Sequence, residues 1–117
     1  MAKFMLLLHE PPGGMDGLSP EEIQSVIQEY SAWAAGLAER DQHAGGGKLT
    51  NEGGRLLSKE GGELRVVDGP YTEAKEVMGG FFMVLADDYD EAVTIAQGCP
   101  HLRHGRIEIR QIDPAGE

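Results

Sequence analysis

The segment from Asp68 to Val77 is the most unusual part of the chain and contains several side chains that could do chemistry. It carries carboxylate, phenol, hydroxyl and ammonium groups without clean periodicity, which predicts an ordered loop or a short turn. A buried aspartate with a raised pKa can act as a general base, so Asp68 is a candidate catalytic residue. Tyr71 and Lys75 are candidate substrate-binding residues, because they could add donors and charge over a small ligand. Alternatively, the opening Asp-Gly-Pro is only a tight turn that leaves a strand.

His9 is the candidate catalytic partner of Asp68. It follows the apolar run 4–8, which predicts a buried strand, and the end of such a strand can open toward a ligand cleft. A histidine that is merely on the surface at a strand end is the alternative. The other histidines, at positions 43, 101 and 104, do not show the helical spacing of a metal pair. We therefore predict no metal site.

Tyr30 and Trp33 lie on a predicted helix. Ser19, Pro20 and Glu22 form a capping box with proline at the first helical position, so the helix begins at Pro20, and its apolar stripe fades near residue 41. Trp33 is expected in the core or at an interface. Together with Tyr30 it is also a candidate for lining a substrate cleft. The glycine run before Lys48 is not followed by a helix that could hold phosphate, and we predict no cofactor site.

The remaining pattern predicts an α+β fold. A second helix is capped by Asp88 and ends at Gly98. The predicted extended segments are 4–8, 48–50, a hairpin with arms 55–58 and 63–67, 81–86 and 105–112. This order predicts a ferredoxin-like antiparallel sheet with two helices on one face. A second copy of the chain is the economical cover for the other face, so we expect a homodimer.

Composition limits the classes of function. The 117 residues suit a single domain, 1–117, and the net charge of −10 disfavours nucleic acid as a partner. The one cysteine, Cys99, excludes an internal disulfide, and no apolar run approaches membrane-spanning length. We therefore expect a cytoplasmic protein with no membrane partner.

The motif Asp68-Gly-Pro-Tyr-Thr-Glu-Ala-Lys-Glu76, followed by Gly79-Gly80-Phe81, resembles the signature of the DGPF branch of the YCII-related family. Tyr71 replaces the family's usual phenylalanine. The resemblance extends over nearly the whole chain, through the opening strand, both helix starts and the strand at 107–110. It implies a ferredoxin-like subunit that forms a dimeric α+β barrel.

The resemblance also implies two kinds of function. Relatives in the YCII branch carry a histidine on the first helix and an aspartate that suggest an acid/base pair, and one related enzyme eliminates chloride from a hydroxylated ring. Members of the DGPF branch often accompany alternative sigma factors. Here the first helix has no histidine, and Tyr30 or a near neighbour occupies that place, so only Asp68 matches a motif residue.

Two hypotheses follow. The first is a small-molecule-binding protein or enzyme that does acid/base chemistry on a small or aromatic metabolite. The alternative is a non-catalytic accessory or regulatory dimer module associated with stress or sigma-factor signalling. An open pocket beside Asp68 would favour the first, and a cleft closed by side chains, with Asp68 capping its own turn, would favour the second.

Overall fold

The computed structural model describes residues 1–69 and 75–116. The strands are β1 (Ala2–Glu10), β2 (His43–Lys48), β3 (Arg55–Glu60), β4 (Glu63–Asp68), β5 (Val77–Ala86) and β6 (Arg106–Gln111). The helices are α1 (Pro20–Glu39) and α2 (Tyr89–Gln97), with short 3₁₀ turns η1 (Pro100–Arg103) and η2 (Pro114–Gly116). No helix in these ranges is long and apolar enough to cross a membrane.

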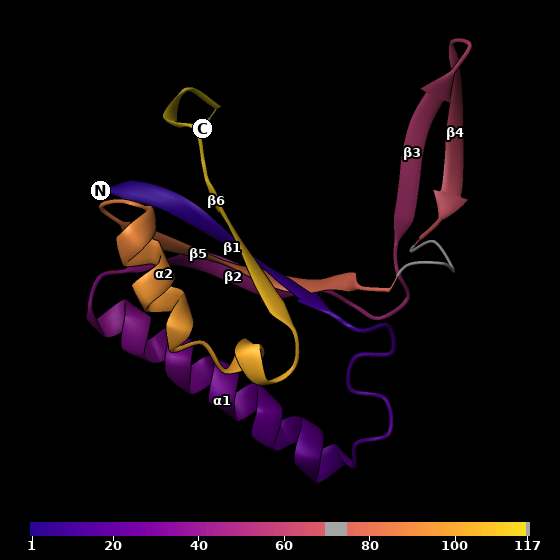
Figure 1. The fold of residues 1–117 in the computed structure, drawn as a ribbon. Coiled ribbons are helices and arrows are strands. Elements are labelled where there is room, and N and C mark those ends of the chain that lie inside the picture. Colours follow the sequence, from indigo (N-terminus) through magenta and orange to yellow (C-terminus); the bar gives the residue numbers. More distant parts are fainter. Residues whose placement is uncertain (70–74, 117) are drawn as a thin grey trace.

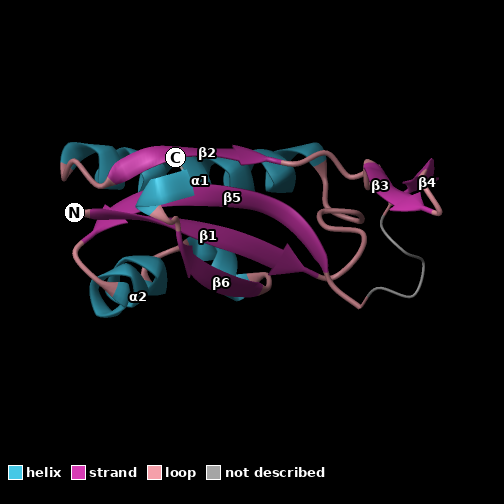
Figure 2. Cartoon of the chain, turned by 90° about the horizontal axis from the view of Figure 1, so that it is seen from above, coloured by secondary structure: helices cyan, strands magenta, loops and turns pink. Residues whose placement is uncertain are grey.

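Four strands form one antiparallel sheet in the order β2-β5-β1-β6. Both helices lie on the same side of this sheet (Figure 1), and the view from above shows the strands in front of them (Figure 2). The two central strands, β1 and β5, come from distant parts of the chain, as in a split β-α-β arrangement. The predicted ferredoxin-like α+β fold is therefore confirmed.

Alternation along the strands separates a packed face from an open one. Phe4 and Leu6 on β1 and Val84 on β5 are fully buried, and they pack with Leu37 of α1 and Ala92 of α2. Burial of these apolar side chains attaches the helices to the sheet. The alternate positions point to the other side, which we call the open face. Its centre consists of half-buried Met5, Leu7, Phe81, Met83 and Leu85.

Local capping sets where both helices begin. The Ser19 hydroxyl accepts a hydrogen bond from the backbone N–H of Glu22 at 3.1 Å, and the Glu22 carboxylate accepts one from the Ser19 N–H at 3.0 Å. Asp88 caps α2 by accepting from the Glu91 N–H at 2.8 Å. These bonds satisfy backbone donors that a helix leaves unpaired at its first turn. Both predicted helix starts are confirmed.

The position predicted for the second strand is wrong. We expected an extended piece at 48–50, whereas β2 covers His43–Lys48 and includes the whole glycine run. β2 is an edge strand that pairs along β5, and backbone hydrogen bonds need no side chains. A bulge between His43 and Gly45 gives Gly45 a φ of 130°, which only glycine adopts readily.

The predicted hairpin is present as β3 and β4, which pair with each other in a separate two-stranded sheet. It projects from the end of the main sheet (Figure 1). The radius of gyration is 16.1 Å, whereas a compact chain of this length has about 13 Å. The turn predicted after Asp68, including Tyr71, lies outside the described residues.

Candidate active site

A cavity of about 570 Å³ lies between the middle of α1 and the packed face of the sheet. This volume is in the range that accommodates small ligands. Its roof includes Val26, Tyr30 and Ala34 of α1, and its floor includes Leu8 and Phe82. The segment between β1 and α1 closes one wall, and η1 together with the residue that follows it closes another.

The cavity exists because the floor lacks side chains where the helix lies above it. Gly46 of β2 and Gly80 of β5 contribute only backbone to the floor. Leu37 holds the C-terminal end of α1 in the core with no exposed surface, whereas Tyr30 and Val26 nearer the N-terminus are only half-buried. The C-terminal end of α1 thus packs directly on the sheet, and the turns before it cover the cavity.

A hydrogen-bonded chain of three groups forms part of the cavity wall. The Tyr30 hydroxyl lies 2.9 Å from Nδ1 of His101, and Nε2 of His101 lies 2.8 Å from the backbone oxygen of His9. Both Tyr30 and His101 line the cavity. The His101 side chain comes from η1, and the residue is only 2% exposed. Hydrogen bonds at both ring nitrogens therefore hold the His101 ring in one orientation.

The chain of bonds determines which atoms carry protons. A backbone carbonyl can only accept, so Nε2 of His101 must carry a hydrogen and donate it to the His9 oxygen. In the neutral imidazole, Nδ1 is then the acceptor, and the Tyr30 hydroxyl donates to it. The pair consequently presents the Tyr30 oxygen to the cavity with a proton acceptor directly behind it.

The phenol of Tyr30 is neutral in the resting state. Burial is the main cause that raises the pKa of Tyr30 above its ordinary value, and nearby Cys99, Glu10 and Glu29 raise it further. Tyr30 is thus a hydrogen-bond donor at neutral pH. It can pass on a proton only if it receives another one as it does so.

The cavity is less acidic than the rest of the chain. Lys48 and Arg103 line it together with His43 and His104, while Glu10 is the carboxylate among its lining residues in the described ranges. The whole chain has a net charge of −10. Arg103 is also paired with Glu29 of α1. The rim therefore offers a local environment suited to a ligand that is, or becomes, negatively charged.

Of the sequence-predicted residues, Tyr30 lines the cavity and Trp33 does not. The Trp33 ring packs edge-on against Phe82 at a centroid distance of 5.0 Å and belongs to the packing around the core. Its neighbour Ala34 lines the cavity, whereas the Trp33 ring points to another side of α1. The contact with Phe82 agrees with the expectation that Trp33 lies in the core, and its substrate-binding role stays a prediction.

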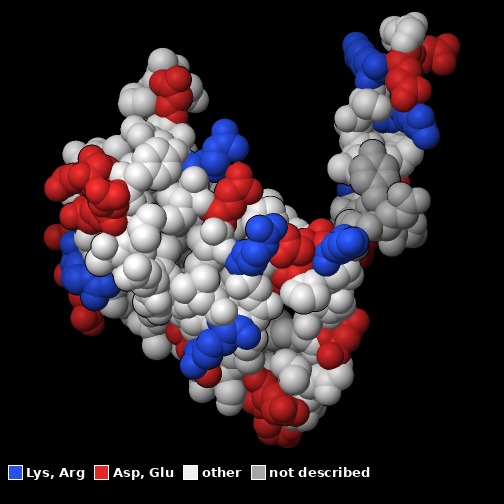
Figure 3. All heavy atoms as spheres, viewed as in Figure 1, with Lys and Arg blue, Asp and Glu red and all other residues white. Residues whose placement is uncertain are grey.

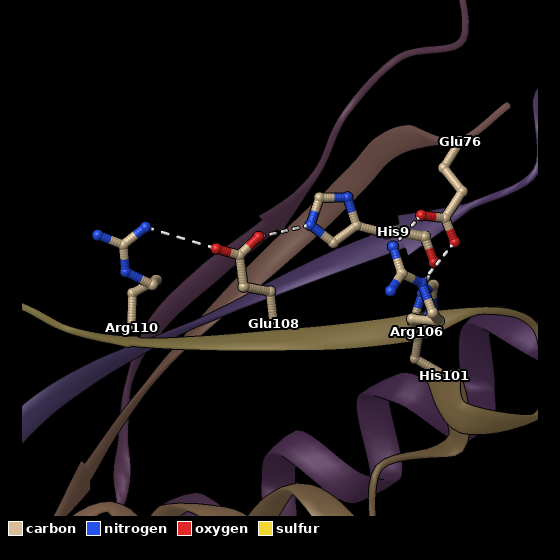
Figure 4. A network of polar contacts seen from close by, with 6 residues as sticks. All are labelled: His9, Glu76, His101, Arg106, Glu108 and Arg110. Atoms are coloured by element: carbon tan, nitrogen blue, oxygen red, sulfur yellow. Dashed lines mark hydrogen bonds and ion pairs between the residues drawn. The ribbon is translucent and has the colours of Figure 1, made fainter. Parts of the chain in front are cut away.

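The His9 side chain lies on the opposite side of the sheet from the cavity. Its Nε2 donates to the Glu108 carboxylate at 2.9 Å, and Glu108 also contacts Arg110 (Figure 4). The hydrogen bond from His9 lowers the pKa of Glu108. Beside this network, Arg106 pairs with Glu76. His9 thus reaches the cavity wall only through its backbone oxygen.

Asp68 lies at the end of β4 on the hairpin, and its side chain is 86% exposed. It forms an ion pair with Arg55 at 3.2 Å and is not among the residues that line the cavity. Lys75 is exposed and does not line it either. Within the described chain, Asp68 is exposed and is paired with Arg55 and not with His9, so the catalytic pairing of Asp68 with His9 stays a prediction. Tyr71 lies outside the described residues.

His101 lines the cavity, although the sequence predicted no role for it beyond excluding a metal pair. Pro100 at the first position of a helical turn is a local signal that η1 could begin there. Its partner Tyr30 is 71 residues away in the sequence. Among residues 1–69 and 75–116, no group of three or more His, Cys, Asp or Glu side chains could hold a metal ion.

Comparison with known proteins identifies relatives of the chain. It is similar to the solved structure of 5-chloro-2-hydroxyhydroquinone dehydrochlorinase from Burkholderia phenoliruptrix AC1100 in complex with 2,5-dihydroxybenzoquinone. The TM-score is 0.50 at 18% sequence identity, over 95% of this chain and 93% of the other, which shows a shared fold. No curated protein matches significantly. The model of the YCII-related domain matches residues 2–115, and the chain therefore belongs to the YCII-related family.

Proposed function

We propose that this protein is a small-molecule enzyme that removes a proton from a hydroxylated aromatic substrate bound under α1. The observation that carries the proposal is the hydrogen bond from Tyr30 to Nδ1 of His101 at the cavity wall. General acid–base groups must lie within hydrogen-bond reach of each other and of the substrate. The hydroxyl of Tyr30 meets both conditions.

The pair can work as a relay. A substrate hydroxyl gives its proton to the Tyr30 oxygen while the Tyr30 proton moves to Nδ1 of His101. The substrate is left as an oxyanion, Tyr30 remains neutral, and His101 becomes an imidazolium. The imidazolium still donates through Nε2 to the His9 carbonyl, a bond that favours the charged ring. On a chlorinated hydroquinone, return of the proton to the ring carbon that bears chlorine gives a keto tautomer. Loss of chloride together with a second hydroxyl proton then forms the quinone, so the net change is loss of HCl.

The walls of the cavity suit an aromatic ring that carries hydroxyl groups. Val26, Ala34 and Phe82 provide apolar surface, and Lys48 with the histidines at the rim favours the developing oxyanion. The enzyme of similar fold is a dehydrochlorinase named for 5-chloro-2-hydroxyhydroquinone, which is a chlorinated ring that carries hydroxyl groups. This supports the same broad class of substrate for the present chain.

The alternative of a non-catalytic accessory module, associated with stress or sigma-factor signalling, predicts a cleft filled by side chains. A cavity of about 570 Å³ favours a ligand-binding role. The cavity does not lie beside Asp68, so the proposal rests on Tyr30 and His101.

We also propose that the protein is a homodimer joined through the open face. The helices cover only one side of the sheet (Figure 2). The burial pattern and strand register place Met5, Leu7, Phe81 and Met83 together on the other side. A face with this much apolar surface is typical of an interface between subunits. A cytoplasmic location remains a prediction from the composition.

The test compares the natural chain with Tyr30→Phe on a panel of hydroxyhydroquinone, chlorinated hydroquinones and 2,5-dihydroxybenzoquinone. Thermal shift reports binding of every compound. Quinone absorbance reports turnover of the chlorinated hydroquinones, which form a quinone by loss of HCl without an oxidant. Tyr30→Phe should retain binding and lose turnover by about 100-fold or more. Tyr89→Phe is the matched control, because Tyr89 is bonded to Gln111 outside the cavity. Equal turnover by the two variants, or no ligand in the panel, would overturn the proposal.

A further inference from the structure

The hairpin of β3 and β4, residues 55–68, is a projecting arm with an apolar side. Leu57 is 63% exposed, Leu64 is 60% exposed and Val66 is 51% exposed. Leu57 faces Val66 across the two strands, and Leu64 is paired with Lys59 two positions further along. Since side chains two residues apart share a face of a strand, these three lie together on one side of the arm.

This arm lacks the support that a hairpin normally needs. Within the described chain, its two strands hydrogen-bond only as a two-stranded sheet and do not extend the main sheet. A lone hairpin in water is marginally stable, and large exposed apolar side chains on it favour association. The arm therefore exposes apolar side chains that a partner could cover, and such a contact would stabilise its two strands.

The arm stands on the same side of the main sheet as the open face. Figure 1 shows the helices below the sheet and the arm rising above it at one end, while η2 rises near the other end. In the space-filling view, a deep notch separates the arm from the body of the chain (Figure 3). A molecule seated on the open face would thus meet the apolar side or the edge of the arm.

The charge distribution allows this molecule to be a second copy of the chain. A chain of net charge −10 repels itself over most of its surface. Acidic residues occupy the first turns of α1 and α2, on the other side of the sheet. On the open face, Glu108 is paired with His9 and Arg110. The arm balances three cations against three carboxylates, which are Arg55, Lys59 and Arg65 with Glu60, Glu63 and Asp68.

The available area also suits a pair of identical chains. Four strands at about 4.8 Å spacing and roughly 25 Å length give an open face of about 500 Å². One side of the arm adds about 200 Å² by the same geometry. The total approaches the roughly 800 Å² that each partner contributes to an interface of standard size. The open face alone falls well short of that area.

We propose that the arm of each chain packs its apolar side, Leu57, Leu64 and Val66, against the partner copy that is seated on the open face. The contact is reciprocal, since the same surface of both chains is used in a twofold dimer. This inference rests on the proposed dimer and adds the arm as the element that completes its interface.

The test replaces Leu57, Leu64 and Val66 with serine together. The variant should weaken the dimer by about 100-fold or more in sedimentation equilibrium, because several large apolar side chains no longer leave water on association. The matched control replaces Val93 and Leu102, which are 43% and 49% exposed, with serine. Those residues belong to α2 and η1, and the control should change the dissociation constant by less than about threefold.

Hydrogen exchange gives a second measurement that does not depend on a variant. In the natural chain, the amides of β3 and β4 should be protected at concentrations where the dimer predominates and should lose that protection on dilution. If the dimer forms but the triple variant associates normally and the arm exchanges freely, the arm inference fails and the dimer stands. If the natural chain is a monomer at every concentration, the proposed dimer and the arm inference both fail. The turnover test of Tyr30→Phe does not depend on this result.

Discussion

The hydroxyl of Tyr30 lies on the wall of an apolar cavity with a basic nitrogen behind it. Burial raises the pKa of Tyr30, so its phenol stays protonated and by itself could not accept a proton from a substrate. His101 changes what the phenol can do, because it can accept the Tyr30 proton as a substrate proton arrives. In the proposed reaction, Tyr30 and His101 therefore act together.

At the scale of single residues, the pair depends on His101 being held at both nitrogens. We expect His101→Ala to lower the free energy of unfolding by about 2–4 kcal/mol, because a buried ring is lost and the His9 oxygen and the Tyr30 hydroxyl lose their partner. Urea denaturation at neutral pH measures the change.

His104→Ala is the control for this prediction. His104 follows η1 directly and is exposed, so its replacement should change stability by no more than about 0.5 kcal/mol. Similar losses for the two variants would show that the bonds of His101 do not contribute specifically to stability.

At the scale of elements, β2 forms an edge of the cavity floor with almost no side chains. Gly46 lies against β5 so closely that an added Cβ would approach the Phe81 oxygen at 2.8 Å and the Phe82 ring at 3.0 Å. Gly47 has space, because its Cβ would meet the Phe81 ring at 3.6 Å. A side chain is therefore excluded by the β5 backbone at Gly46, whereas there is room for one at Gly47.

This difference yields a matched pair of variants. Gly46→Ala should destabilise the chain by about 1–3 kcal/mol, because the β5 backbone would have to move. Gly47→Ala should be neutral or should stabilise it by up to about 1 kcal/mol, since alanine loses less conformational freedom on folding. Thermal unfolding of both variants measures the contrast, and the opposite order would contradict the packing described for β2.

At the scale of the whole molecule, the sheet has helices on one side only, and the open face is the proposed dimer interface. Met83 lies near the middle of that face on the central strand β5. Met83→Glu should leave a monomer at micromolar concentration, because a carboxylate on the interface would face its own copy without a partner.

Val93→Glu on the outer side of α2 is the control for assembly. It adds the same charge at a residue that is 43% exposed, and the dimer should persist. Light scattering at several concentrations distinguishes the two outcomes. A dimer that tolerates Met83→Glu as well as Val93→Glu would exclude the open face as the interface.

The sequence by itself determined the features that depend on near neighbours. Ser19 and Glu22, three residues apart, cap α1 where predicted, and Asp88 does the same for α2. The alternation in the strands and the order of the elements were enough to predict the α+β fold. Such features are encoded locally, because their hydrogen bonds and periodicity lie within one or two helical turns or along one strand.

Only the tertiary structure decided which distant side chains meet. Tyr30 and His101 come together because α1 and η1 pack on the same side of the sheet. The His9 ring points to the opposite side, and Asp68 stands on the hairpin paired with Arg55. A strand sends successive side chains to opposite faces, so the direction of a strand-end residue depends on how the strand is paired and bulged. That pairing involves residues far away in the sequence, which is why the site could not be assembled from local pattern alone.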